Sequence, residues 1–166
     1  MKPALLVVDV QKQFFNISPV TAQSLEEAIE YINAAIEMFR EKDLPVICIQ
    51  HMDKDDKLMP GEDGFEIPDS LNILQADFHV TKTYGNSFNK TPLEAKLREL
   101  GVDTVIVTGF CAEGCVLSTV RGARDCDFNA ILLRGSLASY KPENIGFVES
   151  IHDVISYGAL KAFLPA

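Results

Sequence analysis

The chain has 166 residues, the length of one domain, and we take residues 1–166 as a single domain. Its 15 Lys and Arg residues are outnumbered by 24 Asp and Glu residues, which gives a net charge of −9. Because nucleic-acid binding depends on clustered cations, this balance argues against a nucleic-acid partner.

The apolar residues predict a globular protein that lies outside membranes. With 47% hydrophobic and 23% charged residues, the chain has enough apolar side chains for a core. The first apolar stretch, ALLVV, is interrupted by Asp9, so it predicts neither a signal peptide nor a membrane span. The cysteines are too few for a disulfide scaffold in a chain of this length, so we expect reduced thiols and a cytoplasmic location. They are Cys48, Cys111, Cys115 and Cys126.

Short apolar runs alternate with helical patterns along the whole chain. The first run, ALLVVDV (4–10), precedes a helix over 21–42, and the second run, PVICIQ (45–50), precedes a polar segment over 52–76. The third run, FHVTK (78–82), precedes a helix over 91–100. The fourth run, DTVIVTG (103–109), precedes a helix over 113–125, and the fifth run, NAILLRG (129–135), precedes a helix over 144–157. The sixth run is ALKAF (159–163). The runs are nearly continuous, which is typical of strands buried on both faces of a parallel sheet. This alternation predicts an α/β fold with a doubly wound sheet.

The helices between these runs are supported by periodicity and by end signals. The helix over 21–42 has one apolar stripe at i, i+3, i+4 and i+7 spacing. The helix over 91–100 begins with Thr91 as a cap and Pro92 at its first position, and Gly101 follows its end. The segment 52–76 is longer than most connections, so it is either a functional cover or disordered.

Polar and reactive side chains follow four of the predicted strands. Ligands of open α/β sheets bind outside the carboxyl ends of the strands. Asp9 ends the first strand, Gln50 and His51 the second, and Lys82 the third. The segment GFCAEGCV after the fourth strand places Cys115 at the start of the next helix. An acid, a base and a thiol therefore meet at one edge.

Each of these residues has two interpretations. Cys115 is either a small buried apolar residue or a nucleophile whose pKa the helix N-terminus lowers. Asp9 either caps a neighbouring loop or accepts a proton, because burial raises the pKa of a carboxyl group. Lys82 is either a solvated charge or, beside Asp9, the cation that stabilises a thiolate.

Three segments, DVQKQFF (9–15), KTYGNSF (82–88) and VTGFCAEGCVLSTVRGARD (107–125), resemble the isochorismatase-like cysteine hydrolase family. The resemblance implies a three-layer α/β/α sandwich around a six-stranded parallel, Rossmann-like sheet, and a homo-oligomer. It implies a catalytic triad of Asp9, Lys82 and Cys115. It also implies a non-proline cis peptide between Phe110 and Cys111, and an oxyanion hole formed by the backbone N–H groups of Cys111 and Cys115.

The histidines argue against a metal site. The metal-containing nicotinamidases of that family have an Asp-x-His pair after the second strand and further histidines in the next loop. This chain has Gln50 and His51 at that place, and the segment 52–76 contains no histidine. We therefore predict no metal, with His51 as a hydrogen-bonding residue at the rim, which argues against nicotinamidase activity. No G-x-G-x-x-G follows the first strand, so we expect no dinucleotide and no other cofactor.

The expected activity is cleavage of a C–N amide bond in a small molecule through a thioester. Family members that cleave a vinyl ether lack the cysteine, so Cys115 points to amide chemistry. The substrate pocket is expected to be aromatic, and its candidate residues are Gln11, Phe14, Tyr84, Phe88 and Phe110. Phe14, Phe88 and Phe110 are expected nearest the thiol, and Gln11 is a candidate hydrogen-bond partner of the substrate. Two alternatives stay open: a catalytically silent binding protein and a thiol redox or peroxide-responsive protein.

Overall fold

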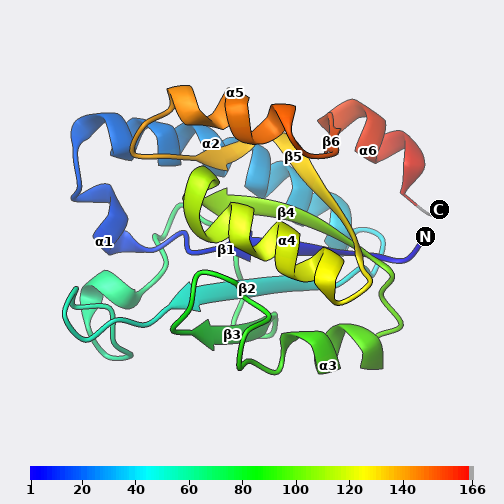
Figure 1. Ribbon diagram of the computed structural model, residues 1–166, viewed down its shortest axis with the longest axis horizontal. Helices are drawn as coiled ribbons and strands as arrows, with labels where there is room; N and C mark the ends of the chain where they lie inside the picture. Colours follow the sequence, from blue (N-terminus) through cyan, green and yellow to red (C-terminus); the bar gives the residue numbers. More distant parts are fainter. Residues whose placement is uncertain (165–166) are drawn as a thin grey trace.

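The computed structural model describes residues 1–164 and contains one six-stranded sheet (Figure 1). Every neighbouring pair of strands is parallel, and the order is β3-β2-β1-β4-β5-β6. This is the doubly wound order in which the carboxyl ends of the central strands open onto a ligand site. The strands are β1 (Pro3–Val8), β2 (Val46–His51), β3 (Phe78–Lys82), β4 (Thr104–Phe110), β5 (Asn129–Ala138) and β6 (Val154–Ile155).

Helices cover both faces of the sheet, as the sequence predicts (Figure 1). The core on one face contains the apolar stripe of α2 and part of α6. The core on the other face contains residues of α3, α4 and α5. The helices are α1 (Lys12–Phe15), α2 (Pro19–Arg40), α3 (Leu93–Glu99), α4 (Leu117–Asp125), α5 (Glu143–Ser150) and α6 (Tyr157–Phe163). Two short turns are added by η1 (Asp63–Phe65) and the π-helical η2 (Ala112–Val116).

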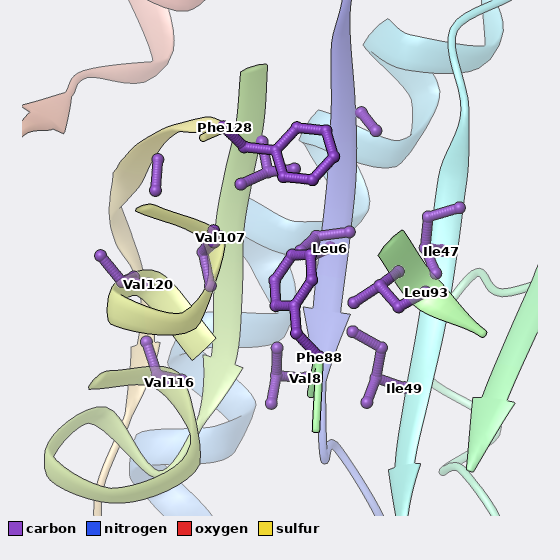
Figure 2. Packing of buried hydrophobic residues seen from close by; sticks show 14 of the residues in the cluster. Leu6, Val8, Ile47, Ile49, Phe88, Leu93, Val107, Val116, Val120 and Phe128 are labelled. Carbon is purple, nitrogen blue, oxygen red and sulfur yellow. The ribbon is translucent and has the colours of Figure 1, made fainter. Parts of the chain in front are cut away.

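The strands contribute side chains to both cores in alternation. Leu5 and Val7 of β1 pack with α2, whereas Leu6 and Val8 pack with α3 and α4. Figure 2 shows Leu6 and Val8 of β1 beside Ile47 and Ile49 of β2, with Val116 of η2 and Val120 of α4 beside the neighbouring β4. Burial on both faces explains why the strands are continuous apolar runs in the sequence.

Three predicted elements differ from the structure near the C-terminus and at α3. ALKAF (159–163) is not a strand but the end of α6, with Leu160 buried in the core. The sixth strand lies instead inside the predicted helix over 144–157, which ends at Ser150 and gives way to β6. The predicted helix over 91–100 begins at Leu93, so its N-cap is Pro92 and not Thr91, whose hydroxyl only accepts from the Leu93 N–H at 3.3 Å.

The predicted helix over 21–42 is α2, which begins two residues earlier than expected. Ser18 is its N-cap and accepts a hydrogen bond from the Thr21 N–H at 3.1 Å, and Pro19 is its first residue. Both residues are favoured at these positions, because Ser satisfies a free N–H and Pro lacks one.

The long segment 52–76 is folded onto the ends of β1 and β2. The carbonyl oxygen of Phe65 accepts hydrogen bonds from the side chains of Gln11 and Gln50, both at 3.0 Å. The Phe65 side chain is itself buried, and a β-bridge joins Asp53 to Leu58. This segment is therefore tied to the strand ends by buried amide side chains.

The segment after β3 is packed closely on α4. Ser87 and Thr119 share a hydroxyl hydrogen bond of 2.7 Å, and the Asn86 side chain lies against Gly122. A Cβ at Gly122 would overlap all three terminal atoms of Asn86, whose Oδ1 is held by the Phe88 N–H at 2.9 Å. This contact fixes the end of β3 relative to the helix that follows η2.

Among residues 1–164, no helix is long and apolar enough to cross a bilayer. Two aromatic side chains are largely exposed: Phe147 on α5 at 64% and Phe163 on α6 at 70%. The homo-oligomer that the resemblance implies stays a prediction.

We expect Gly122→Ala to destabilise the protein, although alanine is the better helix former. The added methyl must displace Asn86, so the free energy of unfolding in urea should fall by about 1–3 kcal/mol. The matched control is Gly146→Ala in α5, where a Cβ meets nothing within 4 Å and a small gain is expected. Asn86→Ala in the same chain should relieve the overlap, and equal stability of the two glycine variants would contradict this packing.

Candidate active site

Four polar side chains converge at the carboxyl edge of the sheet. Asp9 follows β1, His51 and Lys82 are the last residues of β2 and β3, and Cys115 lies in η2 after β4. His51 and Lys82 are paired in register, and the Asp9 N–H donates to the Ile49 carbonyl of β2 at 2.9 Å. Strand pairing therefore fixes three of these residues before any side-chain contact is considered.

The Lys82 side chain joins the other three residues. Its Nζ lies 2.8 Å from Asp9 Oδ2, 3.0 Å from His51 Nδ1 and 3.4 Å from Cys115 Sγ. An ammonium group has three N–H donors, so these contacts use all of them. Lys82 is only 2% exposed, which excludes the interpretation as a solvated charge.

Asp9 is buried with one oxygen unpaired. Its Oδ2 accepts from Lys82, whereas Oδ1 is the buried side-chain oxygen without a hydrogen-bond partner within residues 1–164. Burial raises the pKa of Asp9 above its ordinary value, and the Lys82 charge offsets only part of this. The residue has a φ of 51°, in the left-handed region that aspartate tolerates better than most residues. The arrangement supplies a carboxylate that is available as a proton acceptor.

The pKa of the Cys115 thiol is not lowered, although its predicted place at a helix N-terminus led us to expect that. Burial, followed by the negative charge of Asp9, raises the pKa of its thiol to about 12, although Lys82 acts in the opposite direction. It also lies in η2, two residues before the first residue of α4, with Gly114 in a non-helical conformation. The thiol is therefore protonated at rest, and its reaction requires a base.

His51 is held as a neutral imidazole. Burial, followed by the Lys82 charge, lowers its pKa, and its Nδ1 faces an ammonium that only donates hydrogen bonds. Potential ligand atoms of Asp9, His51 and Cys115 lie within 4.8 Å of one another, a set that can hold a metal ion. However, the Lys82 ammonium already bonds to all three, so a cation would have to displace it. These contacts fit a lysine-centred site, and the absence of a metal stays a prediction.

The turn that carries Cys115 follows a cis peptide bond between Phe110 and Cys111, where the resemblance places one. The Cys111 carbonyl then accepts from the N–H groups of Gly114 and Val116, at 3.0 and 3.2 Å. Gly109, with a φ of 113°, precedes this turn at a point where a Cβ would overlap the Val8 backbone. Only glycine permits β4 to pass β1 this closely.

Glu113, which the sequence interpretation did not assign to the site, fixes this turn. Its carboxylate accepts from Ser139 Oγ at 2.8 Å and from Asn144 Nδ2 at 3.0 Å. Burial opposes ionisation of Glu113, but these hydrogen bonds outweigh it and lower the pKa. Burial, followed by Glu113, raises the pKa of Cys111 to about 12. The carboxylate thus connects η2 to the end of β5 and to α5.

An aromatic group adjoins the nucleophile turn. The rings of Phe14 and Phe110 lie 4.8 Å apart, and Tyr140 meets Phe110 edge-on at 6.4 Å. The structure therefore brings together two of the predicted pocket residues and adds Tyr140, which is 46% exposed. Tyr140 follows β5 and lies far from Phe110 along the chain, so the sequence could not predict this contact.

Two predicted pocket residues have other roles, and a third lies on the surface. Gln11 is fully buried, with its amide bonded to the His51 backbone N–H and carbonyl and to the Phe65 carbonyl, so it cannot bind substrate. Phe88 belongs to the core between the sheet and α4, where its ring lies 5.8 Å from Phe128 (Figure 2). Tyr84 is 43% exposed, and its hydroxyl accepts from Lys90 at 3.1 Å.

We expect Glu113→Gln to lower the free energy of unfolding by about 1 kcal/mol at neutral pH, because an amide accepts fewer hydrogen bonds. A carboxyl group whose pKa is lowered by folding stabilises above its unfolded pKa and loses this effect as pH falls through the folded pKa. The difference from the unsubstituted protein should therefore shrink in acid, as measured by urea unfolding. The exposed Glu37→Gln is the control, and a pH-independent difference would contradict the assignment.

The Isochorismatase domain model matches residues 3–147. The uncharacterized isochorismatase family protein YrdC of Bacillus subtilis is 34% identical over 141 residues, covering 84% of this chain and 75% of that protein. An isochorismatase-like hydrolase from Alkaliphilus metalliredigens has the same fold, with a TM-score of 0.88, 24% identity and 98% of each chain covered. N-carbamoylsarcosine amidase from Thermoplasma acidophilum has a TM-score of 0.80 at 27% identity, covering 94% of this chain and 95% of its own. The family model and the B. subtilis relative show that this chain belongs to the isochorismatase family.

Proposed function

We propose that the chain hydrolyses the C–N bond of a small-molecule amide, with Cys115 as nucleophile, Asp9 as proton acceptor and Lys82 as the stabilising cation. The observation that carries the proposal is the Lys82 ammonium, which contacts both the Asp9 carboxylate and the Cys115 sulfur. A nucleophile, a base and a charged group that orients them are the parts of an activated thiol. The amidase among the similar structures supports the same reaction class.

The first step forms a carbon–sulfur bond. Asp9 takes the thiol proton while Sγ attacks the amide carbon, and the carbonyl oxygen becomes an oxyanion. The unpaired Oδ1 of Asp9 is the free acceptor that this transfer needs. The N–H groups of Cys111 and Cys115 are the proposed oxyanion donors, and each such donor contributes about 3–4 kcal/mol in comparable sites.

The second half of the reaction restores the enzyme. The C–N bond breaks as Asp9 returns its proton to the nitrogen, which leaves as ammonia or an amine and leaves a thioester on Cys115. A water molecule, deprotonated by Asp9, then attacks the thioester carbon. The C–S bond breaks, the sulfur regains a proton from Asp9, and a carboxylic acid is released. One amide and one water give one acid and one amine, without a redox step.

The two alternatives fit the contacts less well. A redox pair needs a second reactive thiol, but the charge of Glu113 opposes a thiolate at Cys111, and among the described residues no cation acts on Cys111 as Lys82 acts on Cys115. A silent binding protein has no need for a buried base with a free oxygen beside the thiol. Hydrolysis therefore remains the function that the geometry supports best.

Cys115→Ala should abolish turnover without unfolding the protein. We expect ammonia release from a panel of primary amides and ureides to fall about a thousand-fold or more, because the carbon–sulfur bond cannot form. Cys126→Ala, a thiol at the end of α4, is the matched control and should retain the rate. Equal activity of Cys115→Ala and the unsubstituted protein would refute the nucleophile, and silence across the panel would favour the binding protein.

The acid limb of the activity profile should report Asp9. Asp9 accepts a proton only when ionised, and burial raises its pKa, so activity should rise with pH through a value above about 3.9, the pKa of an exposed aspartate. The measurement is kcat/KM across the acid range, together with Asp9→Asn, which should be inactive at every pH. An acid limb at or below the ordinary aspartate value would argue against Asp9 as the base.

A further inference from the structure

His51 has a contact that the proposed mechanism does not use. Its Nδ1 lies 3.0 Å from Lys82 Nζ, and its ring is half-buried beside Asp9 and Cys115. We propose that His51 is a positioning residue, a neutral imidazole that accepts the third N–H of Lys82 and so holds the ammonium between Asp9 and Cys115. The inference rests on the proposed function only in assuming that the place of this ammonium governs Cys115.

The chemistry of the contact fixes the tautomer of His51. Because Lys82 can only donate, the hydrogen bond requires a lone pair on Nδ1, and the single proton of the ring must be on Nε2. The charged groups that act on the imidazole are Lys82, which favours the neutral ring, and Asp9, Asp53 and Asp56, which favour the charged ring. Burial and Lys82 prevail, which keeps the ring neutral.

The need for a third acceptor follows from the burial of Lys82. At 2% exposure the ammonium has little access to water, so an N–H without a protein partner would be left unsatisfied. Asp9 and Cys115 take two of the donors, and His51 takes the third. Removal of the imidazole would favour a movement of the ammonium towards water and away from the sulfur.

The backbone of His51 is itself fixed on both sides. Its N–H donates to Gln11 Oε1 at 2.8 Å, and its carbonyl accepts from Gln11 Nε2 at 3.0 Å. Register pairing with Lys82 across β2 and β3 adds a third constraint. Gln11 therefore positions His51, and His51 positions Lys82, which gives the buried Gln11 an indirect link to the site.

Nuclear magnetic resonance tests the tautomer without any substrate. The chain has three histidines, and two serve as internal references: His152 donates from Nδ1 to the Val148 carbonyl, and His79 donates from Nε2 to the Leu74 carbonyl. Long-range proton–nitrogen spectra of the labelled protein above neutral pH should show His51 with its proton on Nε2, like His79 and unlike His152. A proton on Nδ1, or a doubly protonated ring, would overturn the proposal.

Alkylation of Cys115 by iodoacetamide tests the effect on the thiol. His51→Leu removes the acceptor, so the rate should fall about ten-fold or more, as expected for loss of a hydrogen bond to a charged group. His51→Asn keeps an acceptor oxygen near the place of Nδ1 and should remain within about three-fold of the unsubstituted rate. His79→Leu, the same substitution on β3, is the control and should change nothing. An unchanged rate in His51→Leu, or equal slowing in His51→Asn, would overturn the proposal.

Turnover then separates this inference from the proposed function. With any amide that is hydrolysed, His51→Leu should lower kcat about as much as it slows alkylation and leave KM nearly unchanged. A change confined to KM would make His51 a substrate-binding residue and refute the positioning role. If no amide is hydrolysed by the unsubstituted protein, the proposed function fails, while the spectra and the alkylation rates still decide the role of His51.

Discussion

A buried ammonium group organises the carboxyl edge of this sheet. A charge removed from water must be compensated by hydrogen-bonded partners, and loss of one partner leaves a costly unpaired charge. Lys82 satisfies this requirement with three acceptors, which come from the residue after β1, from β2 and from η2. Because each acceptor is of a different chemical kind, the same constraint brings a carboxylate, an imidazole and a thiol within reach of one another.

The surrounding fold provides the rigidity that this arrangement needs. β3, β2, β1 and β4 are neighbours in the sheet, so residues at or after their carboxyl ends reach the same point. The close passage of β4 over β1 at Gly109 and the bonds of Glu113 to Ser139 and Asn144 hold the nucleophile turn from two sides. The packing of Asn86 on Gly122 does the same for the segment that follows Lys82.

The parts that could be predicted from the sequence are those with local or motif signals. Strands buried on both faces are continuous apolar runs, and the three motif segments located Asp9, Lys82 and Cys115. The sixth strand was misplaced because β6 has only two residues, too few for a period, while the one buried residue of ALKAF suits a helix equally well. A single sequence also does not separate a buried aromatic residue of the core from one of a pocket, and the structure packs Phe88 in a core cluster that Cys115 adjoins.

Long-range polar contacts were the other part that could not be predicted. Gln11 looked available for a substrate, yet its three partners come from His51 and Phe65, 40 and 54 positions away. Glu113 finds Ser139 and Asn144 at separations of 26 and 31 positions, and no spacing rule connects such residues. His51 could be placed at the rim from its strand end, but its bond to Lys82 depends on the register of β2 and β3.

The protonation of the site follows from its burial rather than from any helix dipole. Burial raises the pKa of both Asp9 and Cys115, because each would carry a negative charge in a poorly solvated place. With one ammonium nearby, the site favours a single negative charge. That charge lies either on the Asp9 carboxylate, with Cys115 as a thiol, or on the Cys115 thiolate, with Asp9 protonated. The two states differ only in the position of one proton. Transfer of that proton from sulfur to Oδ1 leaves the total charge unchanged, so the low dielectric penalises it less than ionisation into water. A buried lysine can therefore support a reactive sulfur in a site where an isolated thiol would stay inert.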